Sequence, residues 1–336
     1  MNVPTEAEVV ALCARAGLPA PRQIVQLAGG GNNQVFRIDG PAGPALLKAY
    51  FRHPDDPRDR LKAEYSLCRF AWDAGIHCVP RPLASDLADA WGLYEFIEGR
   101  RVEAGEVTWA FVEQAIEFFR ALNRPRESGA ARALANASDA CFSLAENLQT
   151  VERRLARLAG CLTDCEEAKA LVEGPLVAAW RRVSSTMESE AAAARLEMNA
   201  LLPMEERRLS PSDFGFHNCI AQGAVLRFID FEYAGWDDPA KSACDFFCQP
   251  EVPVPIEWFG PTAEAFAADA VDPDRCRRRA DVLMPACRIK WCCIMLNEFL
   301  PLEGRRRSFA RDAATQEARR SAQLQKVRRA LSEMPT

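Results

Sequence analysis

The polar residues between positions 209 and 232 constrain the fold of this chain more than any other feature of its sequence. Asp213 and Asn218 stand five positions apart in a loop with apolar flanks, and Asp230 ends the mostly apolar run 225–229. The first two could simply stabilise their own loop, because an Asx turn uses the same residue types. A carboxylate that follows a mostly apolar run, however, is rarely just an exposed surface residue without a role. A loop and a hairpin that carry these three groups form the arrangement that magnesium-dependent phosphoryl transfer requires.

Each of the three groups has a chemical role in such a reaction. The attacking hydroxyl needs a carboxylate that orients it and accepts its proton, which is the role we expect for Asp213. Magnesium takes hard oxygen ligands, so an amide oxygen and a second carboxylate suit it. We therefore expect Asn218 and Asp230 to bind Mg²⁺ that bridges the phosphates of a nucleotide. We expect His217 to support the loop rather than to act as a base.

Upstream, a lysine and a glutamate are placed where they could meet. Lys48 lies in the apolar run 45–50, and Glu64 lies on the apolar face of a helix predicted over 58–74. A lone strand lysine is most often exposed, but a carboxylate that faces a protein interior is costly unless it is paired. A Lys48–Glu64 pair that holds the α- and β-phosphates of a nucleotide explains both residues at once.

A glycine-rich turn precedes this pair. Gly29, Gly30, Gly31, Asn32 and Asn33 connect two predicted strands. They could form only a flexible hairpin, although a hairpin needs no more than one or two residues of positive φ. Three glycines let the backbone approach a ligand closely, and the two asparagine side chains can donate hydrogen bonds to phosphate oxygens. The turn can thus serve either as a hairpin or as a phosphate-binding loop.

The order of the predicted elements divides the chain into two lobes. A capping box at Thr5 and Glu8 opens a short helix, and five alternating apolar runs predict antiparallel strands, with the 58–74 helix between the third and the fourth. From position 108 onward the pattern becomes helical. We therefore expect an α+β fold with a nucleotide-binding N-lobe over 1–98 and a mainly helical C-lobe over 99–336, which holds the catalytic loop and the acceptor site. The strands are predicted at 24–27, 35–38, 45–50, 80–84 and 91–97.

Charge and composition exclude several classes of function. The formal net charge is −5, and the basic runs 277–279, 305–307 and 319–320 are mixed with acidic residues, so we expect no nucleic-acid partner. Thirteen cysteines without a C-x-x-C pair and only three histidines give no recognisable zinc site. Free thiols fit a reducing cytoplasm, and the N-terminal residues carry no signal-peptide pattern. We expect a cytoplasmic monomer or homodimer that has no membrane partner.

These residues resemble the aminoglycoside phosphotransferase and choline kinase family, which has a protein-kinase-like fold. The resemblance covers residues 27–245 and is strongest in three motifs, Ser212-Asp213-x4-Asn218, Ile229-Asp-Phe-Glu232 and Gly235-x-x-Asp-Pro239. It implies the following site residues: catalytic Asp213, metal-binding Asn218 and Asp230, and a phosphate-holding Lys48 paired with Glu64. It also implies that the segment 94–97, with Glu95 and Ile97, is the hinge that meets the adenine of ATP through its backbone.

One position departs from the family pattern. Where the family has a histidine two residues before the catalytic aspartate, this chain has Pro211, so Ser210, Ser212 or His217 must brace the loop instead. Because every group with a direct chemical role is present, the resemblance implies an ATP- and Mg²⁺-dependent kinase that phosphorylates a hydroxyl of a small molecule. The alternative is a non-catalytic, pseudokinase-like module that binds a nucleotide and regulates a partner.

The acceptor molecule is less constrained by the sequence. In such a fold the acceptor site is built by C-lobe helices, and the sequence of these helices does not identify the acceptor. An acidic groove near Glu232, Asp237 and Asp238 would suit the amino group of an amino sugar or an amino alcohol. Asp237, Asp238 and Asp245 could instead be structural, as helix caps or as carboxylates paired with the catalytic loop, which is the interpretation that we favour for Asp245. A neutral sugar is the other interpretation.

Overall fold

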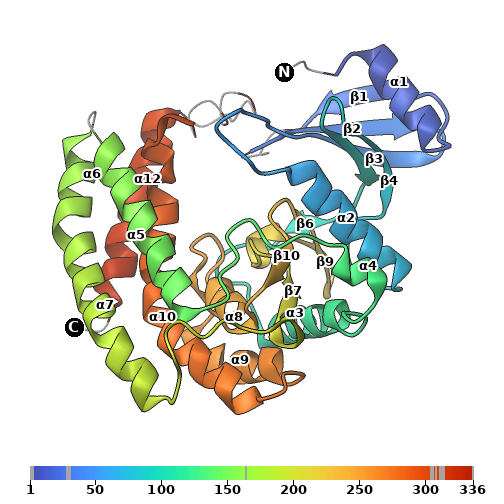
Figure 1. Ribbon diagram of the computed structural model, residues 1–336. Coiled ribbons are helices and arrows are strands. Elements are labelled where there is room, and N and C mark those ends of the chain that lie inside the picture. The colour runs from blue at the N-terminus through green and yellow to red at the C-terminus, as the bar shows by residue number, and fades with distance from the viewer. Residues whose placement is uncertain are drawn as a thin grey trace.

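The computed structural model describes residues 4–27, 32–162, 165–302, 306, 309 and 315–334. The chain has two lobes, an antiparallel sheet with two helices and a larger, mainly helical body (Figure 1). The predicted α+β architecture, with a five-stranded N-terminal sheet and a mainly helical C-terminal part, is therefore confirmed.

The N-terminal sheet has the spatial order β1-β2-β3-β5-β4, and every neighbouring pair of strands is antiparallel. Lys48 on β3 is paired with Val35 on β2 and with Gly92 on β5, so it lies in the middle of the sheet. Gly43, the first residue of β3 after the tight turn from β2, has a φ of +95°, which L side chains rarely adopt. The strands are β1 (Gln23–Gln26), β2 (Gln34–Gly40), β3 (Gly43–Ala49), β4 (Pro82–Asp86) and β5 (Trp91–Glu95).

Two helices flank this sheet. α1 (Glu6–Arg15) opens with the predicted capping box, in which Thr5 and Glu8 satisfy each other's backbone N–H groups. α2 (Arg60–Asp73) follows the third strand and packs against β4 and β5. The buried face of α2 carries Glu64 among apolar residues, so this helix brings a carboxylate to the sheet.

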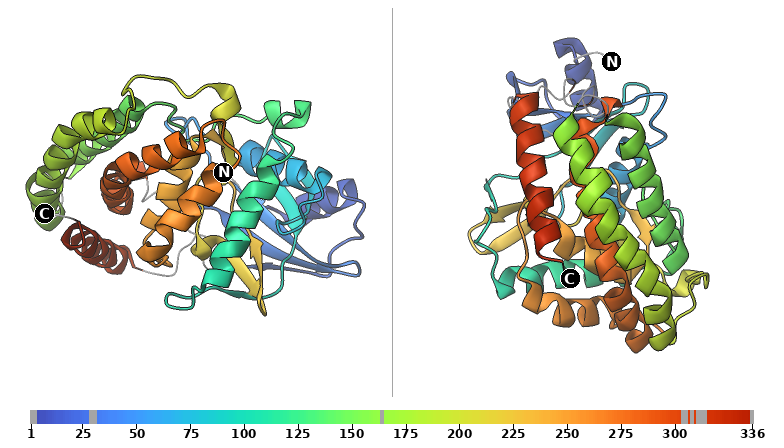
Figure 2. Two further views of the ribbon diagram at one scale, coloured as in Figure 1. Left: turned by 90° about the horizontal axis from the view of Figure 1, so that it is seen from below. Right: turned by 90° about the vertical axis from the view of Figure 1, so that its left-hand side faces the viewer.

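α10 is the central helix of the C-lobe, because it packs against α5, α7, α8, α9 and α12. Figure 2 shows α5, α7 and α12 around α10 on the side away from the N-terminal sheet. Within the described residues, the α-helices of this lobe are α3 (Trp109–Asn123), α4 (Gly129–Arg132), α5 (Leu144–Cys161), α6 (Glu166–Leu171), α7 (Val177–Ala193), α8 (Pro239–Cys248), α9 (Phe259–Ala267), α10 (Pro273–Met295) and α12 (Gln316–Ser332).

Two small sheets hold the segment that carries Asp213 and Asp230. One pairs β7 with β10, and the other has the order β6-β8-β9. Aromatic rings pack beneath this segment, since the ring centroids of Phe118 and Phe228 lie 4.5 Å apart. The strands are β6 (Arg100–Arg101), β7 (Arg208–Ser210), β8 (Cys219–Gln222), β9 (Val225–Phe228) and β10 (Gly235–Asp237).

Two C-lobe helices differ in extent from their predictions. The helix predicted over 138–159 begins only after Ser143, because the preceding backbone takes another course, in which the Cys141 N–H donates to Asp237 Oδ1 at 3.1 Å. The helical stretch predicted over 166–199 contains a π-helical turn at Pro175 and ends at Ala193. Among the described helices, none is both long and apolar enough to cross a lipid bilayer.

Candidate active site

A cleft of about 1200 Å³ is lined by residues of both lobes. Its apolar lining includes Leu27, Val35, Leu46, Ile97, Ile220 and Ile229. The polar and charged residues predicted from the sequence line the same cleft, namely Asn32, Asn33, Lys48, Glu64, Glu95, Asp213, Asn218 and Asp230. The structure thus brings together every described residue of the predicted site. The predicted Gly29, Gly30 and Gly31 lie outside the described residues.

Lys48 joins the two lobes through ion pairs. Its Nζ lies 2.6 Å from Glu64 Oε2 on α2 and 2.7 Å from Asp230 Oδ1 in the C-lobe. Tyr50 also donates its hydroxyl hydrogen to Glu64 Oε2 at 2.8 Å. Burial alone would lower the pKa of Lys48, but the carboxylates of Asp230 and Glu64 outweigh it and raise that pKa above its usual value. A permanently charged ammonium group therefore lies in the cleft.

Hydrogen bonds fix the loop between Asp213 and Asn218. The Asn218 side chain donates from Nδ2 to the backbone carbonyl of Asp213 at 3.0 Å. The backbone carbonyl of Asn218 in turn accepts the N–H of Ile229 at 2.9 Å, which ties the loop to the residue before Asp230. Because Nδ2 is engaged in the loop, the side-chain oxygen is the atom that Asn218 can offer to a ligand.

Two residues of this region have a left-handed backbone, Ser212 with a φ of +67° and Asp230 with a φ of +70°. Such conformations are uncommon outside glycine and gather at functional sites. Ser210 braces the first of them, because its Oγ accepts the Ser212 N–H and the Ser242 hydroxyl, each at 3.0 Å. Ser210 therefore supplies hydrogen bonds next to Pro211, where the family pattern has a histidine.

His217 contacts the carboxylate predicted to be catalytic. Its Nε2 lies 3.3 Å from Asp213 Oδ1, and Arg101 donates to its backbone carbonyl at 3.1 Å. Burial alone would lower the pKa of His217, but the Asp213 carboxylate outweighs it and raises that pKa above its usual value. The ring thus holds one oxygen of Asp213 in place.

Asn32 and Asn33 hydrogen-bond to a carboxylate of the C-lobe. Asn32 Nδ2 donates to Glu232 Oε1 at 2.7 Å, and Asn33 Nδ2 donates to Glu232 Oε2 at 2.6 Å. Alternation along a strand would place Glu232 on the same side as Asp230. However, β9 ends at Phe228, and the left-handed turn at Asp230 directs Glu232 towards the N-lobe instead.

The segment predicted to be the hinge, 94–97, begins with the last two residues of β5 and continues beyond the strand. Glu95 Oε2 accepts hydrogen bonds from Arg227 at 2.9 Å and from the Arg81 backbone N–H at 3.2 Å. The Arg37 guanidinium lies 4.5 Å from the ring centroid of Phe96 and covers it. These contacts hold the hinge beside the apolar part of the cleft.

The prediction of an acidic groove for the acceptor is wrong. Asp237 and Asp238 are fully buried, and they pair with Lys241 and Arg279 respectively. Glu232 is only 1% exposed and is engaged with the N-lobe. Burial of a carboxylate without a partner is costly, and each of these three carboxylates is bonded to a polar or basic side chain inside the protein.

Sequence reasoning favoured a structural role for Asp245, but it missed the buried charge cluster that Asp245 forms on the C-lobe side of the cleft. Asp245 on α8 accepts a hydrogen bond from Lys290 on α10 and another from Trp291 Nε1 at 2.8 Å. Lys241 Nζ lies 3.2 Å from Asp245 and 2.5 Å from Asp237. The spacing of four residues from 237 to 241 to 245 could have indicated one part of this cluster. No local signal relates Lys290 to Asp245, because they are 45 positions apart.

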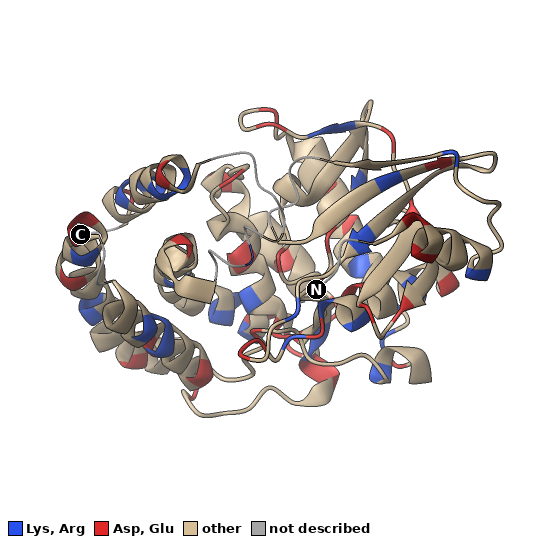
Figure 3. Cartoon of the chain, turned by 90° about the horizontal axis from the view of Figure 1, so that it is seen from above, with Lys and Arg blue, Asp and Glu red and all other residues tan. Residues whose placement is uncertain are grey.

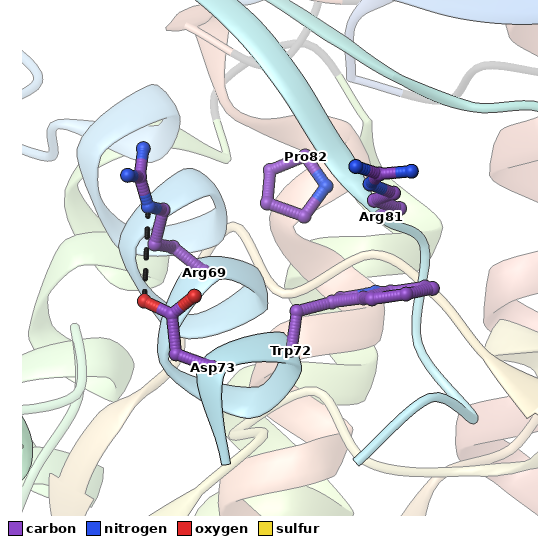
Figure 4. A pocket seen from close by; sticks show the side chains of 5 residues that line it. All are labelled: Arg69, Trp72, Asp73, Arg81 and Pro82. Atoms are coloured by element: carbon purple, nitrogen blue, oxygen red, sulfur yellow. Dashed lines mark ion pairs between the residues drawn. The ribbon is translucent and has the colours of Figure 1, made fainter. Parts of the chain in front are cut away.

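A second, smaller pocket of about 380 Å³ lies between α2 and the start of β4 (Figure 4). It is lined by Arg69, Trp72, Asp73, Arg81 and Pro82, none of which lines the cleft. Its one ion pair, between Arg69 and Asp73, is 3.8 Å long and exposed to solvent. An exposed pair of this kind contributes little, so we assign the pocket no role.

Solved structures with similar folds include several kinases. A choline/ethanolamine kinase family protein from Mesorhizobium loti is 18% identical, with a TM-score of 0.60 over 98% of this chain and 96% of that one. Choline kinase LicA from Streptococcus pneumoniae is 12% identical, with a TM-score of 0.55 over 98% and 100%. Spectinomycin phosphotransferase in complex with ADP and spectinomycin is 12% identical, with a TM-score of 0.60 over 98% and 99%. These similarities establish a shared fold.

Comparison at the level of sequence families is more specific. A search of curated proteins found no match. The profile of the phosphotransferase enzyme family, in contrast, matches residues 23–279, which run from β1 to the first part of α10 and include the whole segment from Asp213 to Asp230. The protein therefore belongs to the phosphotransferase enzyme family.

Proposed function

We propose that this protein transfers the γ-phosphoryl group of ATP to a hydroxyl of a small molecule, a sugar, an amino sugar or an amino alcohol, with the help of Mg²⁺. The observation that carries the proposal is that one cleft holds Lys48, bonded to Glu64 and Asp230, together with Asp213 and Asn218. Phosphoryl transfer asks a protein mainly for positioning and for neutralisation of charge, and these residues supply groups for both.

The donor atoms in the cleft fit a nucleotide and its metal. Asp230 and Asn218 offer hard oxygen atoms, and Mg²⁺ is usually held by one or two such side chains together with substrate phosphates. When bound, Mg²⁺ would neutralise negative charge on those phosphates. Lys48, kept charged and oriented by Glu64, would bind the α- and β-phosphates. The backbone of the hinge at 94–97 would meet the adenine beside the apolar lining.

Asp213 is the residue to which we assign the general-base role. His217 holds its Oδ1 at 3.3 Å, which leaves Oδ2 to accept a hydrogen bond from the acceptor hydroxyl. The proton of that hydroxyl would pass to Asp213 as the new O–P bond forms and the bond between the γ-phosphorus and the leaving oxygen of ADP breaks.

Two measurements test this function. Thermal unfolding with and without ATP and Mg²⁺ reports binding, because a ligand at a hundred times its Kd stabilises the native state by about 2.7 kcal/mol. ADP release over a panel of sugars, aminoglycosides and amino alcohols reports transfer. An unchanged Tm would contradict nucleotide binding. A raised Tm without ADP release from any acceptor would instead identify a nucleotide-binding regulatory module.

A further inference from the structure

Tyr50 lies on the same side of the N-terminal sheet as Lys48. It follows β3 two positions after Lys48, and side chains two positions apart along an extended chain point to the same face. The Tyr50 N–H donates to the Ala90 carbonyl at 2.9 Å, which keeps this backbone beside that of β5. Charged residues of both signs are spread over both lobes (Figure 3), so Lys48 is distinguished by the groups that surround it rather than by its charge. One of them is the Tyr50 ring, whose centroid lies 5.3 Å from Lys48 Nζ.

The hydroxyl groups of Tyr50 and Tyr94 extend the Lys48–Glu64 pair into a chain of hydrogen bonds. Glu64 Oε2 accepts from Lys48 Nζ at 2.6 Å and from the Tyr50 hydroxyl at 2.8 Å. The hydroxyl oxygens of Tyr50 and Tyr94 also lie 2.8 Å apart. Because the single hydroxyl hydrogen of Tyr50 goes to the carboxylate, Tyr94 donates to Tyr50. The chain therefore has one direction, from Tyr94 through Tyr50 to the carboxylate that holds Lys48.

Both hydroxyl groups are buried and keep their hydrogen atoms. Tyr50 is 3% exposed and Tyr94 is 1% exposed, as buried as Glu64 itself. Burial, together with the Glu64 carboxylate, raises the pKa of each tyrosine well above its ordinary value. A buried donor that loses its acceptor is costly, so each hydroxyl group is held to its partner. Glu64 consequently has little freedom to turn away from Lys48.

Gly92 makes room for the Tyr94 ring. It is paired with Lys48 across β3 and β5, and Tyr94 follows two positions later on the same strand. A Cβ atom at position 92 would lie 2.5 Å from Cε2 and 2.7 Å from Oη of Tyr94, which is closer than packed atoms approach. The glycine opposite Lys48 therefore lets the Tyr94 ring lie over β5, where its hydroxyl group meets Tyr50.

The chain of hydrogen bonds connects two parts of the cleft. Tyr94 lines the cleft at the first position of the segment 94–97, where we expect the adenine. Lys48 lines it at the position to which we assign the α- and β-phosphates. The groups between them are the Tyr50 hydroxyl and the Glu64 carboxylate.

We propose that Tyr50 and Tyr94 are positioning residues for the phosphates of the nucleotide, because their hydroxyl groups hold Glu64 and, through it, Lys48. This inference rests on the proposed kinase function. Lys48 Nζ also lies 2.7 Å from Asp230. When phosphates draw Lys48 away from Asp230, Glu64 is the carboxylate that still orients the ammonium group. A Glu64 side chain that Tyr50 already fixes supplies this orientation before the nucleotide arrives, which lowers the cost of binding.

The first test separates binding of the phosphates from binding of the base. Isothermal titration calorimetry measures the Kd of ADP with Mg²⁺ and the Kd of adenosine, which has no phosphate. Tyr50→Phe removes only a hydroxyl group, so the Kd of ADP should rise about three- to tenfold and that of adenosine should change less than about twofold. Tyr94→Phe should raise the Kd of ADP by a smaller factor, since it acts through Tyr50.

Tyr65→Phe is the matched control. The Tyr65 ring packs against Tyr94 with the ring centroids 5.9 Å apart, but its hydroxyl group does not belong to the chain, so both Kd values should stay unchanged. Equal weakening of ADP and adenosine by Tyr50→Phe would indicate a merely structural tyrosine and would overturn the proposal. An unchanged Kd of ADP in this variant would overturn it as well, and both results leave the kinase function intact. A wild type that binds neither ADP nor ATP would instead remove the kinase function, and the proposal with it.

A double-mutant cycle tests whether Tyr50 acts through Glu64. Glu64→Gln keeps the shape of the side chain but removes the charge that holds Lys48. In the Glu64→Gln background, Tyr50→Phe should change the Kd of ADP less than about twofold, because the connection to Lys48 is already broken. If the two losses multiply instead, Tyr50 acts independently of Glu64 and the proposal is wrong.

Discussion

Pro211 has no backbone N–H and no side-chain donor, so the loop that carries Asp213 must be held by its neighbours. Ser210 does this from the side of α8, through its hydrogen bonds to Ser212 and Ser242. His217 does it from within the loop, through its contact with Asp213. A hydroxyl and an imidazole on either side of Asp213, the general base that we propose, thus hold the loop in which the family pattern has a histidine.

Replacement of Asp213 by asparagine tests the residue at the centre of this arrangement. Asp213→Asn keeps the shape of the side chain but removes the proton acceptor, so turnover should fall about 10²–10⁴-fold while the Tm changes little. Steady-state kinetics and thermal unfolding measure the two quantities. Asp274→Asn, an exposed position in the first turn of α10, is the matched control. Turnover close to that of the wild type would remove Asp213 from the mechanism.

At the scale of elements, α8 connects the segment that carries Asp213 and Asp230 to the helical body. The Asp238 side chain caps this helix by accepting the Ala240 N–H at 2.8 Å, and Pro239 occupies its first turn. One face of α8 then buries Lys241 and Asp245, and Asp245 pairs both with Lys241 and with Lys290 of α10. The position of α8, and with it that of Ser242 behind the loop that carries Asp213, therefore depends on a buried charge cluster.

The cluster gives a prediction for stability. Asp245→Ala would leave the ammonium groups of Lys241 and Lys290 buried with fewer counterions, so the free energy of unfolding should fall by about 3–5 kcal/mol. Urea denaturation measures this change. Asp281→Ala on α10 also breaks an ion pair with a basic residue, but its side chain is 55% exposed, and its cost should stay within about 1 kcal/mol. Equal costs for the two variants would show that burial of the cluster is unimportant.

The same carboxylate predicts a dependence of stability on pH. Burial alone would raise the pKa of Asp245, but Lys290 and Lys241 outweigh it and lower the pKa from 3.8 to about 2. A folded-state pKa below the unfolded one means that the stabilisation is present above pH 3.8 and is lost as the pH falls towards 2. The free energy of unfolding should therefore fall more steeply over this range in the wild type than in Asp245→Asn. Parallel curves in urea titrations would contradict this assignment.

The elements and the site differ in how far the sequence could predict them. The strands and α2 were predictable because alternation, turn residues and capping boxes are local signals. The contact between Lys48 and Glu64 was also foreseeable, since a carboxylate on an apolar helix face needs a partner. The contact of Glu232 with Asn32 could not be predicted. The two residues are 200 positions apart, and the contact depends on the left-handed turn at Asp230, which no residue pattern indicates.

At the scale of the whole molecule, polar contacts join the lobes across the cleft. Glu232 accepts the Asn32 and Asn33 amides on one side, and its Oε2 lies 3.8 Å from the buried guanidinium of Arg60 on α2. Lys48 reaches from the sheet to Asp230. The sheet is therefore held over the helical lobe by residues that belong to the predicted nucleotide site or lie next to it.

Glu232→Gln should loosen this contact. A glutamine has one oxygen acceptor instead of two, so its amide N–H₂ would face the N–H₂ of Asn32 or Asn33, and Arg60 would lose a nearby negative charge. The free energy of unfolding in urea should fall by about 1–3 kcal/mol. Glu264→Gln, an exposed position on α9, is the control and should change it little. An unaffected Glu232→Gln variant would mean that the lobes are held together elsewhere.

The bond between Lys48 and Asp230 has a thermodynamic consequence for the order of ligand binding. The carboxylate that we assign to Mg²⁺ is neutralised by an ammonium of the protein itself, so a metal ion must compete with Lys48 for Asp230. Phosphates that attract Lys48 remove that competition, and a metal on Asp230 in turn releases Lys48 for the phosphates. The two affinities are linked, and each ligand strengthens the binding of the other by the same factor. The cleft therefore favours the pair, metal and nucleotide together, over either one alone.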